Sequence, residues 1–129
     1  MQVQLGGVAL NVADVERSVA FYSEVFGLEV HQRIPLPAMT EVIVGPPDGA
    51  AGSSVMLVQH DDRGGPTDPS EVVEKLYFVT SDVHTLYDRA LAAGAEPVAP
   101  PARATAFPVT IALVRDPDGY KTELVETPA

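Results

Sequence analysis

Two stretches of the chain carry apolar residues at the three- and four-residue spacing of an amphipathic helix. The first covers Val15–Phe26 and the second covers Val83–Ala93, and in each the spacing gathers apolar side chains on one helical face. Asp14 precedes the first stretch as an N-cap, and Gly27 follows it as a residue suited to end a helix. The pattern therefore predicts two helices, one in each half of the chain.

Runs of apolar and β-branched residues, separated by proline and glycine, lie beside the two predicted helices. Such runs are typical of β-strands. Proline is expected to interrupt a strand at Ile34–Pro37 because it cannot donate to a ladder, and Asp116–Gly119 has the composition of a type I turn. The expected strands are Val3–Val12, Leu28–Val30, Glu41–Val44, Ser54–His60, Lys75–Thr80, Glu96–Ala99, Thr110–Arg115 and Thr122–Glu126.

The order of elements repeats at an offset of 68 residues. Val12–Val15 aligns with Thr80–Val83, and Val30 aligns with Val98 at the same offset. Neither half would bury a comfortable core alone, because small domains bury a small fraction of their surface. We therefore expect one α+β domain over residues 1–129. It consists of a first βαβββ module over residues 1–60, a linker over 61–73 and a second βαβββ module over 74–129.

Composition and charge exclude several classes of function. The 129 residues are 46% hydrophobic, carry a formal net charge of −10 and include no cysteine. An acidic surface repels nucleic acid, and no apolar run approaches the roughly 18 residues that cross a membrane. Without cysteine there is no disulfide, no thiolate nucleophile and no Cys-ligated metal. We expect a cytoplasmic protein that binds neither nucleic acid nor membrane.

Four segments resemble a known family in their order and spacing. They are Asn11–Ser18, Phe21–Tyr22, Phe26–Leu28 and Asp116–Leu124. Together they resemble the glyoxalase/bleomycin-resistance/dioxygenase family, also called the vicinal oxygen chelate superfamily, and the closing segment is similar to the lactoylglutathione lyases. The resemblance implies a glyoxalase-like domain whose sheets form a cup-shaped, half-open barrel. An open sheet of that kind leaves edges that need covering, so we expect a homodimer.

The resemblance also implies four metal-ligand positions, two in each module. Metal-dependent members carry His or Glu there, whereas the matching residues are Gly7, Met56, Lys75 and Glu123. A hard or borderline divalent ion needs several oxygen or imidazole donors, and Glu123 alone supplies one. We therefore expect no metal site and no cofactor, and the metal-dependent reactions of the family lose support.

Other residues of the implied cup suggest a pocket for an organic ligand. Lys75 and Glu123 are expected to be neighbours, with the Lys cation in place of the metal. The pair is either a polar anchor or catalytic pair, or a charge pair that neutralises a leftover carboxylate. The segment Ala99–Pro108 is either a lid or pocket edge, or an ordinary proline-stiffened loop. The expected ligand-binding residues are Met39, Met56, His60, Tyr77, Phe107, Tyr120 and Glu123.

Three functions remain open at this point. The first is metal-independent binding or sequestration of a small molecule, such as a drug or an aromatic metabolite, as in relatives that confer bleomycin resistance. The second is a lyase, isomerase or dioxygenase-type enzyme that uses Glu123 with Lys75 or His60. The third is a degenerate copy with a structural role only. Retention of Glu123 without the other ligand types favours the first and third functions.

Overall fold

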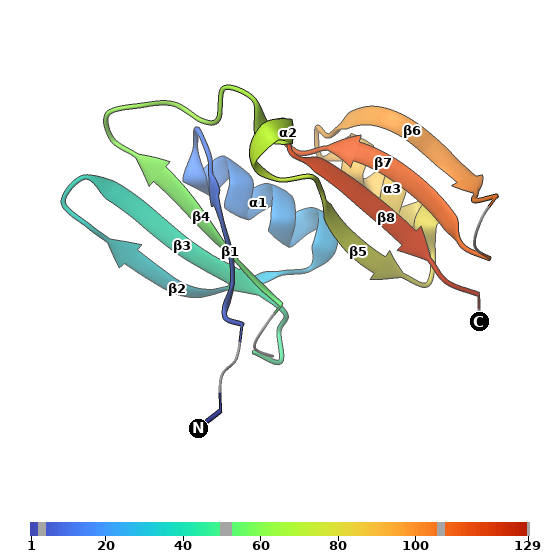
Figure 1. The fold of residues 1–129 in the computed structure, drawn as a ribbon, viewed down its shortest axis with the longest axis horizontal. Helices are drawn as coiled ribbons and strands as arrows, with labels where there is room; N and C mark the ends of the chain where they lie inside the picture. Colours follow the sequence, from blue (N-terminus) through green and yellow to red (C-terminus); the bar gives the residue numbers. More distant parts are fainter. Residues whose placement is uncertain (3–4, 50–52, 106–107, 129) are drawn as a thin grey trace. The chain divides into compact units, whose positions relative to one another are not determined.

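The chain forms two compact units of similar construction. The computed structural model describes residues 1–2, 5–49, 53–105 and 108–128. Unit 1 covers Met1–Pro66 and unit 2 covers Thr67–Ala129. Each unit contains a four-stranded sheet and one long helix (Figure 1). The described strands thus form two separate sheets in an α+β fold and no closed barrel.

Unit 1 has the strand–helix–three-strand order that the sequence predicts. Its strands are joined in the order β1-β4-β3-β2, with β1 parallel to β4 and the other neighbours antiparallel. Helix α1 is the predicted helix, and Gly27 follows it with a left-handed φ of 69°. The elements are β1 (Gly7–Asn11), α1 (Val15–Phe26), β2 (Glu29–Pro35), β3 (Met39–Gly45) and β4 (Ser54–His60).

Unit 2 repeats the same topology. Its strand order is β5-β8-β7-β6, again with the first pair parallel and the other pairs antiparallel. The predicted duplication of a βαβββ module is therefore confirmed. The elements are α2 (Pro69–Val72), β5 (Leu76–Thr80), α3 (Val83–Ala92), β6 (Glu96–Arg103), β7 (Thr110–Arg115) and β8 (Lys121–Glu126).

The core of each unit lies between its long helix and one face of its sheet. In unit 1 the fully buried Tyr22 of α1 lies edge-on to Phe21, with ring centroids 5.3 Å apart. In unit 2 Leu86 of α3 and Leu124 of β8 are buried. Because side chains alternate along a strand, every second residue of each strand lies on the opposite face. We call that opposite face the helix-free face of the sheet.

Both long helices begin with an aspartate N-cap. The Oδ1 atom of Asp14 accepts a hydrogen bond from the amide of Arg17, and Asp82 does the same for Thr85, at 3.1 Å in each case. The hydroxyl of Thr85 also donates to Asp82. The hydroxyl and the amide of Thr85 together hold the pKa of Asp82 below its ordinary value. The caps satisfy helix amides that would otherwise lack partners.

The last strand of each unit supplies a second cap to the same helix. The Oε1 atom of Gln59 in β4 accepts from the amide of Val15 at 2.8 Å. In β8, Glu126 Oε1 accepts from the amide of Val83 at 3.0 Å. These bonds attach α1 to β4 and α3 to β8.

Replacing Glu126 with alanine is expected to lower the free energy of unfolding by about 1 kcal/mol, because a helix amide then loses its acceptor. The matched control is Glu126→Gln, since a glutamine already forms the equivalent bond in unit 1. Urea unfolding followed by circular dichroism measures the difference. Equal midpoints for the alanine and glutamine variants would contradict the role of this cap.

Two strands extend through prolines where the sequence predicted a break. Strand β2 continues to Pro35, and β6 passes through Pro100 and Pro101 to Arg103 instead of stopping at Ala99. Both are edge strands. Proline is tolerated there because the side of the strand without a neighbour needs no amide donor. The register of β6 also shifts between Ala99 and Ala102. The segment Ala99–Pro108, expected to be either a lid or an ordinary loop, is therefore an edge strand as far as Arg103, and its residues 106–107 lie outside the described residues.

Other details also differ from the sequence prediction. Strand β1 begins at Gly7 rather than Val3, and residues 3–4 lie outside the described residues. Strand β5 begins at Leu76, one residue after Lys75. The predicted linker contains the short helix α2, which begins at Pro69, a residue whose fixed φ suits the first turn of a helix.

Candidate functional site

The helix-free face of the sheet in unit 2 carries the charged candidates. In β8, Thr122 and Leu124 are buried on the helix side, so Lys121 and Glu123 lie on the helix-free face. Strand β5 pairs in register with β8, with Tyr77 opposite Glu123. The side chain of Tyr77 is 68% exposed. An aromatic ring and a carboxylate therefore lie beside each other on this face.

Lys75 and Glu123 form an ion pair. The Nζ atom of Lys75 donates to Oε2 of Glu123 at 2.7 Å, and the two side chains are 38% and 18% exposed. The expectation that these residues are neighbours is thus confirmed, although Lys75 lies just before β5. The ammonium is a fixed cation at one oxygen of the carboxylate. Such a pair can anchor a polar ligand or act in proton transfer.

The turn between β7 and β8 sets the position of Glu123. The amide of Gly119 donates to the carbonyl of Asp116 at 2.9 Å, as in the predicted type I turn. The buried Asp116 accepts through Oδ1 from the amides of Asp118 and Tyr120, at 2.9 Å each. These three bonds hold the hairpin in the register that pairs Leu113 with Glu123.

Tyr120 does not lie on the helix-free face. Its side chain is 1% exposed, and it alternates with Lys121 toward the helix side of the sheet. The structure therefore places Tyr120 in the core of unit 2, which corrects its assignment as a ligand-binding residue. The backbone of Tyr120 is held in the neighbouring turn, where its amide donates to the buried Asp116.

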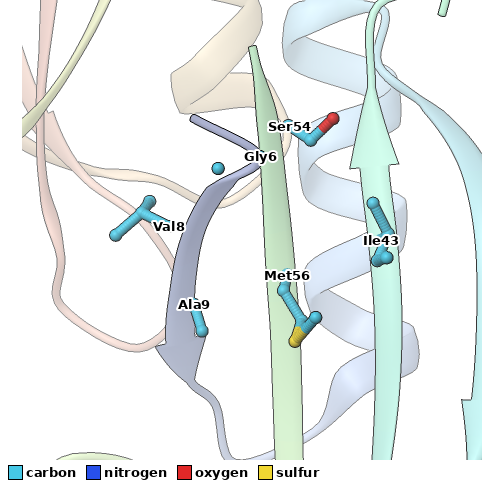
Figure 2. Close-up of a pocket in the computed structure, with 7 residues that line it drawn as sticks. Gly6, Val8, Ala9, Ile43, Ser54 and Met56 are labelled. Carbon is cyan, nitrogen blue, oxygen red and sulfur yellow. The ribbon is translucent and has the colours of Figure 1, made fainter. Parts of the chain in front are cut away.

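Unit 1 contains an apolar hollow of about 250 Å³ on its sheet (Figure 2). Met56 of β4 lies in register with Ala9 on one side and Ile43 on the other. Figure 2 shows the side chains of Met56 and Ile43 on neighbouring strands, with Ala9 beside Met56. The hollow is lined by Gly6, Gly7, Val8, Ala9, Ile43, Ser54 and Met56.

Gly7 allows the two strands beside this hollow to approach closely. A Cβ atom at Gly7 would lie 2.3 Å from the carbonyl oxygen of Ser54, and the φ of Gly7 is 156°. A side chain at position 7 would therefore need the backbone to move. The hollow thus depends on the absence of a side chain where metal-dependent relatives are expected to carry histidine.

The two units place their four family positions in the same local register. Met56 is opposite Ala9, and Glu123 is opposite Tyr77. The other family position of each unit lies two residues before Ala9 or Tyr77 in the sequence. Because side chains alternate along a strand, it shares a face with that residue. The equivalent positions are Gly7 and Met56 in unit 1, and Lys75 and Glu123 in unit 2.

The donor set at these positions does not fit a divalent metal ion. Gly7 has no donor atom, and Met56 offers only a soft thioether. Lys75 is a cation and forms an ion pair with Glu123, the one carboxylate of the set. Hard and borderline ions require oxygen or imidazole ligands. Within the described ranges no group of three or more His, Cys, Asp or Glu residues could hold a metal. The residues at these four positions therefore do not support a reaction step that depends on a bound divalent metal ion.

The other predicted ligand residues lie at separate places. Met39 and His60 are paired in register at one end of β3 and β4. The guanidinium of Arg63 donates to Nε2 of His60 at 2.7 Å. Phe107 lies outside the described residues. The structure thus brings Met39 and His60 together in unit 1, and Tyr77 and Glu123 together in unit 2.

Sequence reasoning missed the glycine and alanine contribution to the hollow. Gly6, Gly7 and Ala9 line it, yet small residues give little signal except as gaps in an apolar pattern. Alternation along β8 places Lys121 on the same face as Glu123. The charge that adjoins it across the β7–β8 hairpin, Arg115, was not recognised as part of the same face.

The repeated βαβββ topology defines a class of two-module α+β proteins. The chain belongs to the Glyoxalase/Bleomycin resistance protein/Dioxygenase superfamily, whose family model matches residues 4–124. In the described part of the chain, no helix has both the length and the apolar character needed to cross a membrane.

Individual relatives are distant in sequence and close in fold. The chain is 25% identical over 120 residues to "Probable lactoylglutathione lyase" of Synechocystis sp., covering 92% of this chain and 91% of that protein. A glyoxylase/bleomycin resistance protein/dioxygenase domain from Frankia sp. EAN1pec superposes with a TM-score of 0.78 at 24% identity, covering 99% and 94% of the two chains. Glyoxalase I from Zea mays gives a TM-score of 0.74 at 21% identity, covering 95% of this chain. The chain spans only 44% of that maize protein.

Proposed function

We propose that this chain is a metal-independent protein that binds or sequesters a small organic molecule, such as a drug or an aromatic metabolite. The observation that carries the proposal is the ion pair between Lys75 and Glu123, at 2.7 Å. It supplies the one carboxylate among the four family positions with an internal cation. Because the Lys75 ammonium balances the negative charge of Glu123, no metal ion is needed for that purpose.

Electrostatics support this assignment. A divalent ion about 4 Å from the Lys75 ammonium would be repelled by about 8 kcal/mol at an effective dielectric constant near 20. The single carboxylate of Glu123 offsets only part of that repulsion and is already bonded to Lys75. Binding a metal there would therefore require the ion pair to separate.

The surroundings of the family positions favour an apolar or aromatic ligand body. In unit 1 the hollow beside Met56 is lined mainly by apolar side chains. In unit 2 the exposed ring of Tyr77 lies opposite Glu123. Apolar walls with a few polar groups are characteristic of small-molecule sites. Each unit thus offers a surface of suitable chemistry.

A screen of chelator-treated protein against neutral and charged aromatic compounds tests the proposal. We expect at least one compound to raise the melting temperature by several degrees and to lose most of that effect in Tyr77→Ala or Met56→Ala. The matched controls are Val72→Ala and Leu36→Ala, which truncate exposed apolar side chains outside the two sheets. Failure of every compound to bind would contradict the proposal.

The second candidate function is a lyase, isomerase or dioxygenase-type enzyme. The observation that favours it is Glu123 itself, a partly exposed carboxylate with a cation at one oxygen, which could serve as a general base. Turnover of the bound compound that disappears in Glu123→Gln, with binding retained, would favour this enzyme over a sequestering protein.

A homodimer in solution is the expected oligomeric state. Edge strands of both sheets leave backbone groups unpaired, and exposed apolar side chains need covering. We expect sedimentation at micromolar concentration to give twice the mass of one chain. A single-chain mass at all concentrations would contradict the dimer. The exposed apolar residues on the strands are Val8, Val30, Tyr77, Val79 and Val98.

A further inference from the structure

Three of the five Lys and Arg residues of unit 2 lie in one row at the start of β8. The chain has a net charge of −10 and eight Lys and Arg residues. Both lysines of the chain, Lys75 and Lys121, lie in this row, together with one of its arginines, Arg115. Arg115 and Lys121 are directly opposite each other on β7 and β8. Lys75 precedes the rung that pairs Leu76 with Thr122, which brings it to the other side of Lys121.

Two of the three cations have partners within the unit. Lys75 is bonded to Glu123 at 2.7 Å, and Arg115 donates to the carbonyl of Gly119 at 3.1 Å. Glu96 also lies opposite Arg115 on β6. Lys121 has no hydrogen-bond or ion-pair partner among the side chains that the structure describes.

Like charges directly opposite each other on a sheet are destabilising. Lys75 and Arg115 each have a partner in unit 2, whereas Lys121 between them has none among the described side chains. A bound anion at Lys121 would therefore relieve the repulsion along the row. Tyr77, one rung further along the sheet and 68% exposed, offers an aromatic face next to the same row. A ligand with an aromatic body and one oxyanion group matches both features.

We infer that the helix-free face of unit 2 recognises an aromatic oxyanion, a carboxylate or a phosphate, with Lys121 as the residue that contacts the charged group. The inference rests on the proposed function, because it names the chemical class of the small molecule that the chain binds. Lys121 donates to the oxyanion, Arg115 adds positive charge beside it, and Tyr77 contacts the ring. Glu123 stays bonded to Lys75 and so repels the anion less than an unpaired carboxylate would.

Three matched compounds test this inference: 2-naphthoate, 2-naphthyl phosphate and the neutral 2-naphthamide. We expect the carboxylate or the phosphate to bind about tenfold more tightly than the amide at low salt, the gain of one charge-assisted hydrogen bond. Which of the two binds more tightly identifies the oxyanion. Lys121→Gln should abolish the preference, by lowering the affinity for the carboxylate and the phosphate to about that of the amide.

The control variant is Arg103→Gln, which removes the same charge from an exposed residue at the end of β6 and should retain the preference. Equal affinities for all three compounds, or an equal loss in both variants, would overturn the inference. If a neutral compound of the wider screen binds and these anions do not, the inference fails while the proposed function stands. If no compound of the screen binds, both fail together.

Discussion

Replacing Lys75 with histidine is expected to create zinc affinity that the natural chain lacks. The substitution removes a cation from Glu123 and adds an imidazole, a preferred zinc ligand, at an equivalent family position. We expect zinc affinity to rise on the order of 100-fold, about 2.7 kcal/mol. That is a fraction of the roughly 8 kcal/mol of repulsion that the lysine would exert at about 4 Å. Isothermal titration calorimetry on chelator-treated protein measures the change.

Two variants make this expectation specific. Lys75→His combined with Glu123→Gln should lose the gained affinity, because the carboxylate ligand is absent. Lys75→Met removes the cation without adding a ligand and should give a smaller gain. Zinc binding to the natural chain as tight as to Lys75→His would show that the lysine does not exclude metal.

Replacing Asp116 with alanine is expected to produce the largest loss of stability among the substitutions considered. Its buried carboxylate accepts from the amides of Asp118 and Tyr120 at 2.9 Å. Alanine leaves both donors without that acceptor, at a cost of about 2–4 kcal/mol. Because the same turn sets the register of Glu123, ligand binding in unit 2 should weaken as well. Chemical unfolding and the melting-temperature screen measure the two effects.

The matched control is Asp116→Asn, whose side-chain oxygen can still accept both bonds. It should retain most of the stability and most of the ligand response. An asparagine variant as unstable as the alanine variant would indicate that the negative charge of Asp116 matters more than its acceptor geometry.

The helices and the duplicated topology could be predicted because local signals are strong there. The apolar spacing of Val15–Phe26 and the cap residue Asp14 both follow from rules that act within a few residues. The observed helix α1 has those same bounds, and Asp14 caps it. The offset of 68 residues predicted the second module because matching elements recur in the same order.

The strand ends at Pro35 and Arg103 could not be predicted in the same way. Whether a proline ends a strand depends on whether the strand lies at an edge of its sheet, and edge position follows from tertiary pairing. Strands β2 and β6 are both edge strands. The sequence therefore predicted too early an end for each of them.

The candidate site was predictable where the resemblance to the family implied neighbouring positions. Lys75 and Glu123 were expected to be neighbours, and their 2.7 Å ion pair confirms it. Tyr120 could not be placed by the resemblance, because its side chain alternates with Lys121 and is buried in the core. The hollow beside Gly7 could not be predicted either, since it depends on the close approach of Gly7 to the Ser54 carbonyl.

The central claim is that the natural chain binds its organic ligand without a metal. The most direct measurement is calorimetric titration of chelator-treated protein with zinc, nickel, manganese and iron(II), alongside Glu123→Gln. The account predicts no stoichiometric uptake of any of these ions by either protein. Stoichiometric binding to the natural chain that vanishes in Glu123→Gln would contradict it and make the enzyme the leading function.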